Sequence, residues 1–286
     1  MTDISRVGVI GAGLMGSGIA EVHARAGADV VITEVSQPAL DAGQARIEKS
    51  LQRGVRSGKL TEEDAAAALN RLTFTTDLES FADRDLVIEA VIEQEQAKLE
   101  VFRSLDKVVE RADAIFASNT SSIPIMKLGM ATNRPKQVIG IHFFNPVPVL
   151  PLVELVPSLL TSEETIKRAD EHATGMLGKT VIRSQDRAGF IVNSLLVPYL
   201  LSAIRMIESG FASAEDIDRG MELGTAHPMG PLRLSDLIGL DTIKAIAESM
   251  YDEFKEPLYS PPPLLLRMVD AGLLGKKSGR GFYSYE

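Results

Sequence analysis

Short apolar segments alternate with helical patterns along the first two thirds of the chain. An apolar run from Val7 to Ile10 ends at Gly11, and apolar positions from Leu14 to Ala26 then recur at helical spacing. Further helical patterns cover about residues 38–57, the segment after Thr61 and residues 96–110. Six further apolar runs have the length of a strand: ADVVITE, LTFTT, DLVIEAV, AIFASN, VIGIHFF and LVELV. Strands that alternate with helices predict an α/β fold with a doubly wound, mostly parallel sheet.

The pattern changes after TVIRSQDRAGF, at residues 180–190. From Gly189 onward the apolar positions indicate helices only, at about residues 190–209, 214–224, 231–255 and 261–273. We place the boundary between Thr180 and Arg187. The sequence thus predicts an α/β domain at residues 1–184 and an all-helical domain at residues 185–286.

The turn after the first strand has the pattern GxGxxG, from Gly11 to Gly16. In a dinucleotide-binding unit the first glycine permits a tight turn, Gly13 lets a pyrophosphate approach, and Gly16 allows the helix to pack closely on the strand. The helix that begins here also directs unpaired N–H groups at the phosphates. A tight turn without any ligand is the alternative.

Glu34 ends the second strand about 20 residues further on, as dinucleotide-binding units require. A carboxylate there accepts a hydrogen bond from a ribose 2′-hydroxyl and repels a 2′-phosphate, so NAD is favoured over NADP. We therefore expect a Rossmann-type NAD-binding domain, with these cofactor residues: Gly11, Gly13, Leu14, Met15, Gly16 and Glu34.

One histidine and one glutamate interrupt the apolar segment IHFFNPVPVLPLVEL, residues 141–155. A buried charge is costly unless a partner offsets it. The two flanking runs are predicted to be successive strands, so Glu154 can accept the imidazole N–H of His142, orient the ring and stabilise its protonated form. Histidine suits general-base catalysis because its ordinary pKa lies near working pH. A structural histidine bonded to a backbone carbonyl is the alternative for His142.

Other polar residues also follow predicted strand ends. Asn145 comes after VIGIHFF, and the cluster SNTSS, residues 118–122, comes after AIFA. In an open α/β sheet these ends line the ligand crevice, so both are candidates for ligand contact.

Cations recur at helical spacing in the long second helical pattern and just beyond it, and we call them the basic ridge: Arg46, Lys49, Arg53, Arg56 and Lys59. The apolar positions Ile47, Leu51 and Val55 lie on the opposite side. A solvated helix face is one interpretation of the basic ridge. The other interpretation is that the basic ridge binds an anionic ligand larger than a simple metabolite.

Composition removes several classes of partner and site. The net charge is −9, which disfavours nucleic acid as a partner because a polyanion needs a basic surface. Cysteine is absent, so we expect no disulfide, no thiol nucleophile and no metal site of the zinc-ribbon kind. The start MTDISRVGVI lacks the pattern of a signal peptide, and the apolar stretch FIVNSLLVPYLLSAI is too short and too polar to span a bilayer. We expect a soluble, cytoplasmic protein with no membrane partner.

Seven motifs in order resemble those of the NAD-dependent L-3-hydroxyacyl-CoA dehydrogenases, and the chain is most similar to the free-standing bacterial enzymes of that family. They are GAGLMGSGIA, IEAVIE, FASNTSS, HFFNPVP with LVEL, GFIVNSLLVPYL, HPMGPLRLSDLIGLD and GKKSGRGFY. The resemblance covers essentially the whole chain. It implies a Rossmann-type NAD-binding domain followed by a helical substrate and dimerisation domain, and an acyl-CoA as substrate.

The resemblance also implies roles for single residues. His142 would be the general base for oxidation of the 3-hydroxyl group, Glu154 its partner, and Ser121 and Asn193 the contacts of the substrate oxygen. Positions that match NAD contacts of the family are Glu34, Glu93, Lys98, Ser121, Asn145 and Lys277. Ser50 matches a coenzyme A contact. A second coenzyme A position, often lysine in the family, is Ser57 here. We therefore expect Arg53, Arg56 and Lys59 of the basic ridge to bind coenzyme A.

The implied reaction interconverts (S)-3-hydroxybutyryl-CoA and acetoacetyl-CoA, or short-chain homologues, with NAD. Two rival hypotheses remain. One keeps the fold and takes a free hydroxy acid or sugar acid as substrate. The other is a dinucleotide-sensing protein without turnover, against which the full set of His142, Glu154, Ser121 and Asn193 argues.

The remaining histidines have weaker claims. His23 and His172 lie in helical patterns and are expected to be structural or surface residues, and His227 is expected to shape the loop before PMGP. The helical domain is more apolar than a small bundle needs, notably in LLVPYLLSAI and PPPLLLRMV. On this ground and by resemblance we expect a homodimer.

Overall fold

The computed structural model describes residues 4–285. The chain divides into two compact units, Met1–Arg187 and Ala188–Glu286, and each is described by itself. Each unit has a buried apolar cluster of its own. Within residues 4–285, no helix combines the length and the apolar character that crossing a membrane requires.

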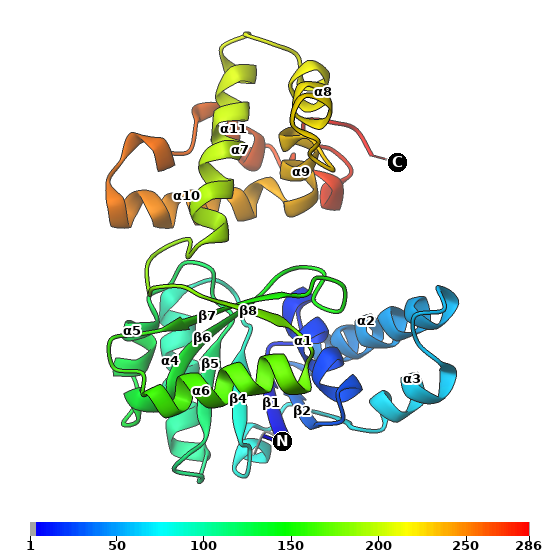
Figure 1. Ribbon diagram of the computed structural model, residues 1–286, viewed down its shortest axis with the longest axis vertical. Helices are drawn as coiled ribbons and strands as arrows, with labels where there is room; N and C mark the ends of the chain where they lie inside the picture. Colours follow the sequence, from blue (N-terminus) through cyan, green and yellow to red (C-terminus); the bar gives the residue numbers. More distant parts are fainter. Residues whose placement is uncertain (1–3, 286) are drawn as a thin grey trace. The chain divides into compact units, whose positions relative to one another are not determined.

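Among the described residues, the first unit is built on an eight-stranded sheet of order β3-β2-β1-β4-β5-β6-β7-β8 (Figure 1). The strands are β1 (Arg6–Ile10), β2 (Asp29–Thr33), β3 (Leu72–Thr75), β4 (Leu86–Glu89), β5 (Ile115–Ser118), β6 (Val138–Phe143), β7 (Leu152–Pro157) and β8 (Thr180–Arg183). Neighbouring strands are parallel except for β6 and β7, which are antiparallel. The predicted doubly wound, mostly parallel α/β fold is confirmed.

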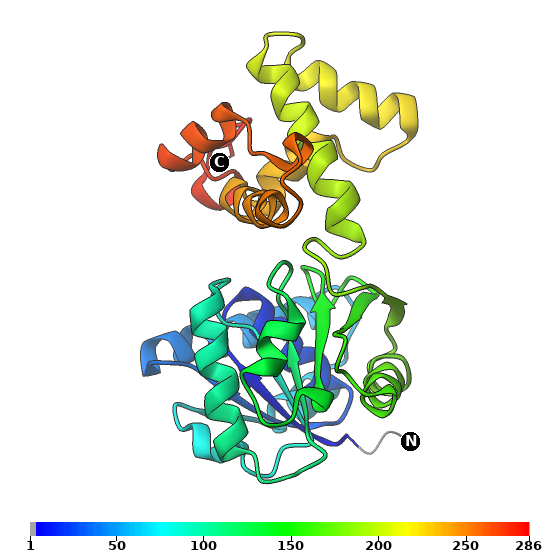
Figure 2. The ribbon, with the colours of Figure 1, turned by 90° about the vertical axis from the view of Figure 1, so that its left-hand side faces the viewer.

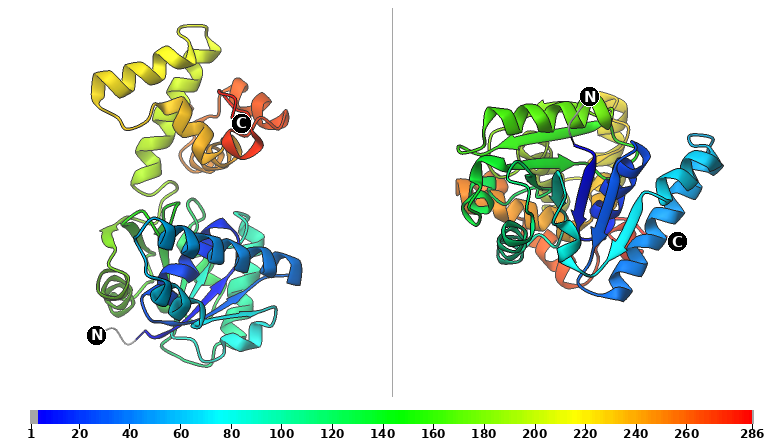
Figure 3. Two further views of the ribbon diagram at one scale, coloured as in Figure 1. Left: turned by 90° about the vertical axis from the view of Figure 1, so that its right-hand side faces the viewer. Right: turned by 90° about the horizontal axis from the view of Figure 1, so that it is seen from below.

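Helices cover both faces of this sheet: α1 (Leu14–Arg25), α2 (Gln37–Arg56), α3 (Glu62–Leu69), α4 (Glu95–Val108), α5 (Ile125–Met130) and α6 (Glu163–Glu171). The sheet separates α4 and α5 from α6, which lies on the same face as α1 (Figure 2). Helices α2 and α3 form a hairpin at the β3 edge (Figure 3). The predicted start of α3 is confirmed, because the Thr61 side chain accepts a hydrogen bond from the Asp64 N–H.

The sequence analysis does not predict β8, and it indicates α6 only through the helical pattern around His172. The strand β8 has only four residues, none fully buried, so its segment TVIR gives no apolar run. It pairs in parallel with β7, which extends the sheet into the segment assigned to the domain boundary. Helix α6 has the sequence EETIKRADE, in which charged residues outnumber apolar ones, so its narrow apolar stripe is easily missed.

His23 of α1 and His172 after α6 are buried against each other in the first unit. Their ring centroids lie 5.1 Å apart at an interplanar angle of 21°, and the two residues are 0% and 1% exposed. The Nδ1 of His23 lies 2.7 Å from the Ile19 carbonyl oxygen, to which it donates. Burial lowers the pKa of His23 to about 4 and that of His172 to about 3, so both rings are neutral near pH 7. Both histidines are therefore structural.

This pair makes the stability of the first unit sensitive to acid. The unfolded chain protonates both rings near pH 6.5, whereas the folded chain excludes these protons until about pH 4 and 3, so stability falls as pH drops through this window. Between pH 7.5 and pH 5 we expect each histidine to lower the free energy of unfolding by about 2 kcal/mol. Urea unfolding of the His172→Phe variant at both pH values should show about 2 kcal/mol less loss than the parent. The exposed His227 provides the control, and an equal loss in His172→Phe and His227→Phe would contradict the prediction.

The described part of the second unit contains α7 (Val192–Glu208), α8 (Ala214–Thr225), α9 (Pro231–Ile238), α10 (Leu240–Phe254) and α11 (Pro263–Asp270). The predicted single helix at 231–255 is wrong, because Gly239 at φ +103° interrupts it and separates α9 from α10. The predicted helical character of this domain is confirmed, and its C-terminal segment adds isolated antiparallel bridges of Arg280 with Gly275 and Ser284. Asp236, 1% exposed, holds that segment by accepting the Phe282 N–H at 3.0 Å.

Candidate active site

The glycine turn joins β1 to α1 and leaves space beside its backbone. Gly11 has φ +96°, and a Cβ there would lie 2.6 Å from the Ala90 carbonyl oxygen, so only glycine fits. A Cβ on Gly16 would lie 1.7 Å from the Gly11 oxygen. Beside Gly13, by contrast, no atom lies within 4 Å of the Cβ position. Two of the glycines are thus required by the turn, and the third leaves room for a ligand to approach.

The N-terminus of α1 faces the same space. It begins at Leu14 after Gly13, and no side chain caps it, so its first N–H groups can serve an anion such as a pyrophosphate. Leu14 is 64% exposed, whereas Met15 packs against the core. Arg46, the first cation of the basic ridge, donates to the Ala12 carbonyl oxygen at 2.6 Å.

Glu34 lies directly after β2, at the same sheet edge as the glycine turn. Its Oε1 accepts the Ala12 N–H at 2.9 Å and its Oε2 accepts the Val35 N–H at 3.0 Å. These bonds hold the carboxylate beside the turn, where it can accept a ribose hydroxyl. The turn, the uncapped helix and Glu34 therefore fit the requirements of NAD.

A buried ionic cluster occupies the carboxyl ends of β4 and β5. Lys98 of α4 is 1% exposed and bonds to Glu89, which is 0% exposed, while its Nζ lies 3.1 Å from Glu93 Oε2. The Glu89 carboxylate also accepts the Ser118 hydroxyl at 2.6 Å. The paired charges offset the cost of burying each other, so Lys98 acts on the site through Glu93 and does not present its amine to solvent.

Glu93 in turn organises the loop after β5. Its Oε1 accepts the Ser121 N–H at 3.0 Å, the Ser122 hydroxyl at 3.1 Å and the Thr120 hydroxyl. Burial raises the pKa of Glu93. The charge of Lys98 and the hydrogen bonds from Thr120 and Ser121 lower it by more, so the pKa of Glu93 lies below its ordinary value. The ionised carboxylate thus fixes the position of the partly exposed Ser121.

His142 and Glu154 face each other across the antiparallel pair β6 and β7. They are direct partners in the strand register, and the His142 Nδ1 lies 2.7 Å from Glu154 Oε2. His142 is 6% exposed and Glu154 is 0% exposed. With Nδ1 bonded to the carboxylate, Nε2 is the ring nitrogen that can exchange a proton with a substrate. The ring also lies against Phe144, with centroids 4.6 Å apart.

Asn119 connects the end of β5 to the end of β6. Its Oδ1 accepts the Phe143 N–H at 2.8 Å, next to His142 in the chain. Asn145 follows at the exposed start of the connection to β7, where its peptide bond to Pro146 is cis. The loop of Ser121 and the strand of His142 are therefore tied together at one edge of the sheet.

Two of the predicted residues belong to the second unit. Asn193 lies in the first turn of α7 and is 9% exposed. Lys277 follows α11, and its Nζ forms an ion pair with Asp241, with an Nζ to Oδ2 distance of 2.6 Å. The structure thus groups the first-unit candidates for cofactor binding and proton transfer around one sheet edge, and it holds Asn193 and Lys277 on a separate unit.

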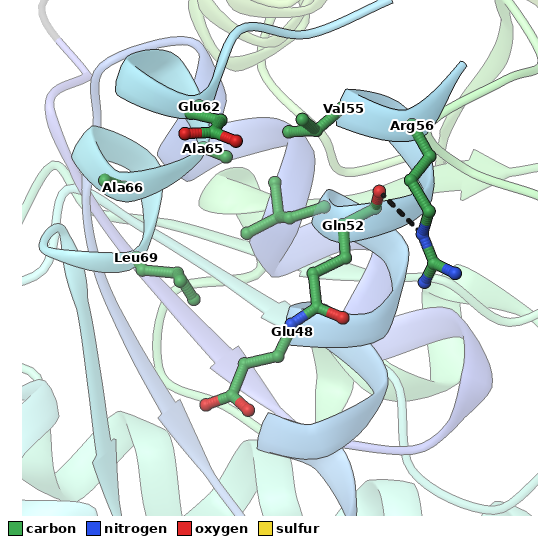
Figure 4. A pocket seen from close by; sticks show the side chains of 9 residues that line it. Glu48, Gln52, Val55, Arg56, Glu62, Ala65, Ala66 and Leu69 are labelled. Carbon is green, nitrogen blue, oxygen red and sulfur yellow. Dashed lines mark hydrogen bonds between the residues drawn. The ribbon is translucent and has the colours of Figure 1, made fainter. Parts of the chain in front are cut away.

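The basic ridge follows the exposed side of α2 and the turn after it, while Ile47 and Leu51 on the opposite side are 1% exposed. Ser50 and Arg53 face Glu21 of α1. Arg56 lines a pocket of about 510 Å³ between α2 and α3, and its Nε donates to the Gln52 carbonyl oxygen at 3.4 Å (Figure 4). The cations of the basic ridge therefore do not all face one site.

The sequence analysis did not single out Glu89 or Asn119. Glu89 is the last residue of the buried strand LVIE, and an acid at the end of an apolar strand is the same signal that identified Glu34. Asn119 lay inside the cluster SNTSS, but the sequence does not show that its amide bonds to the next strand.

The grouping of these residues allows a specific chemistry. An imidazole oriented by a buried carboxylate can take or give a proton. It lies on the sheet whose carboxyl edge also holds the glycine turn, Glu34 and the hydroxyl loop of Ser121. Proton transfer beside a bound dinucleotide is the combination that oxidation of an alcohol requires.

Comparisons with known proteins show the family to which the chain is related. A model for the 3-hydroxyacyl-CoA dehydrogenase NAD binding domain matches residues 6–187, and one for the 3-hydroxyacyl-CoA dehydrogenase C-terminal domain matches residues 189–285. The chain is 63% identical over 282 residues to a 3-hydroxybutyryl-CoA dehydrogenase of Mycobacterium tuberculosis, with 99% of each chain covered.

Two solved structures are similar over the whole chain. The crystal structure of M. tuberculosis FadB2 gives a TM-score of 0.98 at 63% identity, covering 99% of both chains. The crystal structure of (S)-3-hydroxybutyryl-CoA dehydrogenase PaaH1 from Ralstonia eutropha gives 0.92 at 44% identity, covering 99% of this chain and 100% of that one.

Proposed function

Because the chain belongs to the 3-hydroxyacyl-CoA dehydrogenase family, we propose that it interconverts (S)-3-hydroxybutyryl-CoA and acetoacetyl-CoA with NAD. The observation that supports this most directly is the buried pair of His142 and Glu154, 2.7 Å apart on the sheet that also forms the glycine turn. The names of the similar proteins supply the substrate class.

NAD is held by residues of the first unit, with Lys277 of the second unit as a further contact. The N–H groups at the start of α1, next to Gly13, Leu14 and Met15, bind the pyrophosphate, and Glu34 binds the ribose. Glu93 and Asn145 would be further contacts of NAD, with Lys98 holding Glu93 in place. When bound, NAD supplies the hydride acceptor.

His142 takes the proton of the 3-hydroxyl group at Nε2 during oxidation and returns it during reduction. Glu154 keeps Nδ1 protonated, so that one ring nitrogen is always directed at the carboxylate. Ser121 and Asn193 donate hydrogen bonds to the substrate oxygen as its charge changes, which stabilises the transition state more than the ground state. Ser50 and Arg53 contact the coenzyme A portion, with Arg56 and Lys59 as further cations of the basic ridge.

Oxidation of NADH, followed by absorbance, tests the proposal directly. We expect turnover with acetoacetyl-CoA and little or none with free acetoacetate or with free sugar acids. Turnover that requires a free acid would favour a hydroxy-acid dehydrogenase instead. Binding of NADH without turnover of any of these compounds would favour a dinucleotide-sensing protein.

The preference for NAD over NADP is expected to depend on Glu34. In Glu34→Gln the amide can still accept the Ala12 N–H, but the negative charge that repels a 2′-phosphate is gone. Since hydrogen bonds to charged groups are worth about 1.5–3 kcal/mol, the ratio of kcat/KM for NADH to that for NADPH should fall at least about tenfold. Glu110→Gln, an exposed acid outside the site, is the control. An unchanged ratio in Glu34→Gln would reject this role.

A homodimer formed through the second unit is also proposed. Leu195, Phe211 and Leu223 of that unit are each at least 75% exposed, and exposed apolar side chains of this size favour burial in an interface. Light scattering should give twice the chain mass of 30.9 kDa, and Leu223→Glu should shift the population toward monomer. Leu159→Glu, which alters a 94% exposed leucine of the first unit, should leave the mass unchanged. A monomer at all working concentrations would contradict the proposal.

A further inference from the structure

A second concave site lies on the face of the first unit that α1 and α6 cover, and we call it the basic pocket. It has a volume of about 510 Å³. Its walls come from the end of α1, from α3, from the connection between β6 and β7, and from the segment before β8: Val22, Arg25, Ala26, Leu60, Asp64, Ala67, Arg71, Pro148, Met176, Leu177 and Lys179. None of the residues that we assign to the reaction lines it.

The lining of the basic pocket carries an excess of positive charge. Arg25, Arg71 and Lys179 are its cations and Asp64 is its acid. Arg25 has a partner outside the lining, since its Nη1 lies 3.3 Å from Glu21 Oε1. In residues 4–285 neither Arg71 nor Lys179 forms an ion pair. An acidic protein thus gathers three cations and a single acid around one cavity.

Lys179 is held so that its charge remains at the cavity. Its Nζ donates to the Val147 carbonyl oxygen at 2.6 Å and to the Leu150 carbonyl oxygen at 2.7 Å, which leaves one of its three N–H groups for a ligand. Burial lowers the pKa of Lys179, and the positive charge of Arg25 lowers it further. A dianion in the pocket would remove this repulsion between cations.

The basic pocket is next to the proposed coenzyme A contacts. Ser50 and Arg53 face Glu21, and Arg25 follows Glu21 by one turn of α1. Arg25 of the basic pocket therefore lies one turn of α1 beyond Glu21, the residue that the proposed contacts on α2 face.

The pocket is also within reach of the reacting group. Pro148 lies six residues after His142, so their Cα atoms are at most about 20 Å apart. The extended pantetheine and pyrophosphate arm of coenzyme A can bridge such a separation.

We propose that the basic pocket binds the 3′-phosphate of the coenzyme A portion of the substrate, through Arg25, Arg71 and Lys179. This assignment rests on the proposed function. A phosphate monoester carries nearly two negative charges near neutral pH, which suits a cluster of three cations better than a singly charged pyrophosphate oxygen does. Apolar side chains beside the cations, such as Leu60 and Pro148, offer a surface for the adenine ring.

Isothermal titration calorimetry can test this without turnover. The probes are adenosine 3′,5′-bisphosphate, adenosine 5′-monophosphate and inorganic phosphate. We expect the bisphosphate to bind at least about tenfold more tightly than either other probe, because the charge-assisted hydrogen bonds to the 3′-phosphate are added to the contacts of the adenosine. In Arg71→Met this advantage should disappear.

Arg71→Met is the first variant because Arg71 is exposed and its side chain makes a single long hydrogen bond, 3.3 Å to the Ala24 carbonyl oxygen. Lys179→Met is the second, with its thermal unfolding measured because Lys179 also holds the connection to β7. The control is Lys107→Met, an exposed lysine of α4 on the other face of the sheet, which should bind all three probes as the parent does.

Kinetics separate this proposal from the proposed function. Arg71→Met should raise KM for acetoacetyl-CoA about tenfold and leave KM for the 3′-dephospho analogue at the parent value. Equal effects on both substrates, no preference of the parent for the bisphosphate, or equally tight binding of inorganic phosphate would each overturn the assignment. Absence of NADH oxidation by the parent, with tight bisphosphate binding that Arg71→Met weakens, would instead reject the proposed function alone.

Discussion

Replacing His142 by alanine is expected to lower kcat for reduction of acetoacetyl-CoA by about 10²–10⁴-fold, the range that a positioned general acid or base supplies. The Nδ1 of His142 is bonded to Glu154, and its Nε2 is proposed to exchange the proton with the substrate oxygen. Water can replace this group only with poorer geometry. The measurement is the rate of NADH oxidation at saturating acetoacetyl-CoA.

The design of this experiment must separate chemistry from folding. Alanine leaves the Glu154 carboxylate, 0% exposed, without its imidazole partner, which destabilises the fold. His142→Gln retains a polar side chain of similar length and should show the same kinetic loss with a smaller change in thermal unfolding. NADH affinity, measured by fluorescence, should stay at the parent value in both variants. His227→Ala alters an exposed histidine of the second unit and is the matched control. Turnover near the parent level in His142→Ala would reject the assignment of the base.

Replacing Glu154 by glutamine is expected to lower kcat by about 10²-fold or more. The amide has the shape of the carboxylate but no charge, and its N–H group can donate to Nδ1 and select the wrong tautomer of the imidazole. The strand register places the two residues directly opposite each other, so the backbone should not move. The measurement is again kcat for acetoacetyl-CoA, with NADH affinity as a check on folding.

A double-mutant cycle distinguishes this role from a merely structural one. If Glu154 acts through His142, then Glu154→Gln should add almost nothing to the loss in a chain that already has His142→Gln. The conservative variant Glu154→Asp, which keeps the charge, should recover part of the activity. Losses that multiply independently in the double variant would show that Glu154 does not act through the imidazole.

The sequence by itself determined the features that depend on neighbours in the chain. Hydrophobic periodicity identified seven of the eight strands, because a buried strand needs its own apolar run. The turn at Gly11 follows from glycine spacing, since only glycine adopts φ +96° without strain. The pairing of His142 with Glu154 was also predictable, because a short connection forces two successive strands into contact. The length of the connection did not determine which side chains of the two strands would lie opposite each other.

Only the tertiary structure decided the features that depend on segments distant in the chain. The stack of His23 on His172, the burial of Lys98 between Glu89 and Glu93, and the gathering of Arg25, Arg71 and Lys179 around one cavity each join separate elements. A charged or polar side chain has the same sequence pattern whether it meets solvent, an opposite charge or a ligand. Its environment depends on which helices and strands pack beside it, and the burial of the whole core fixes that packing.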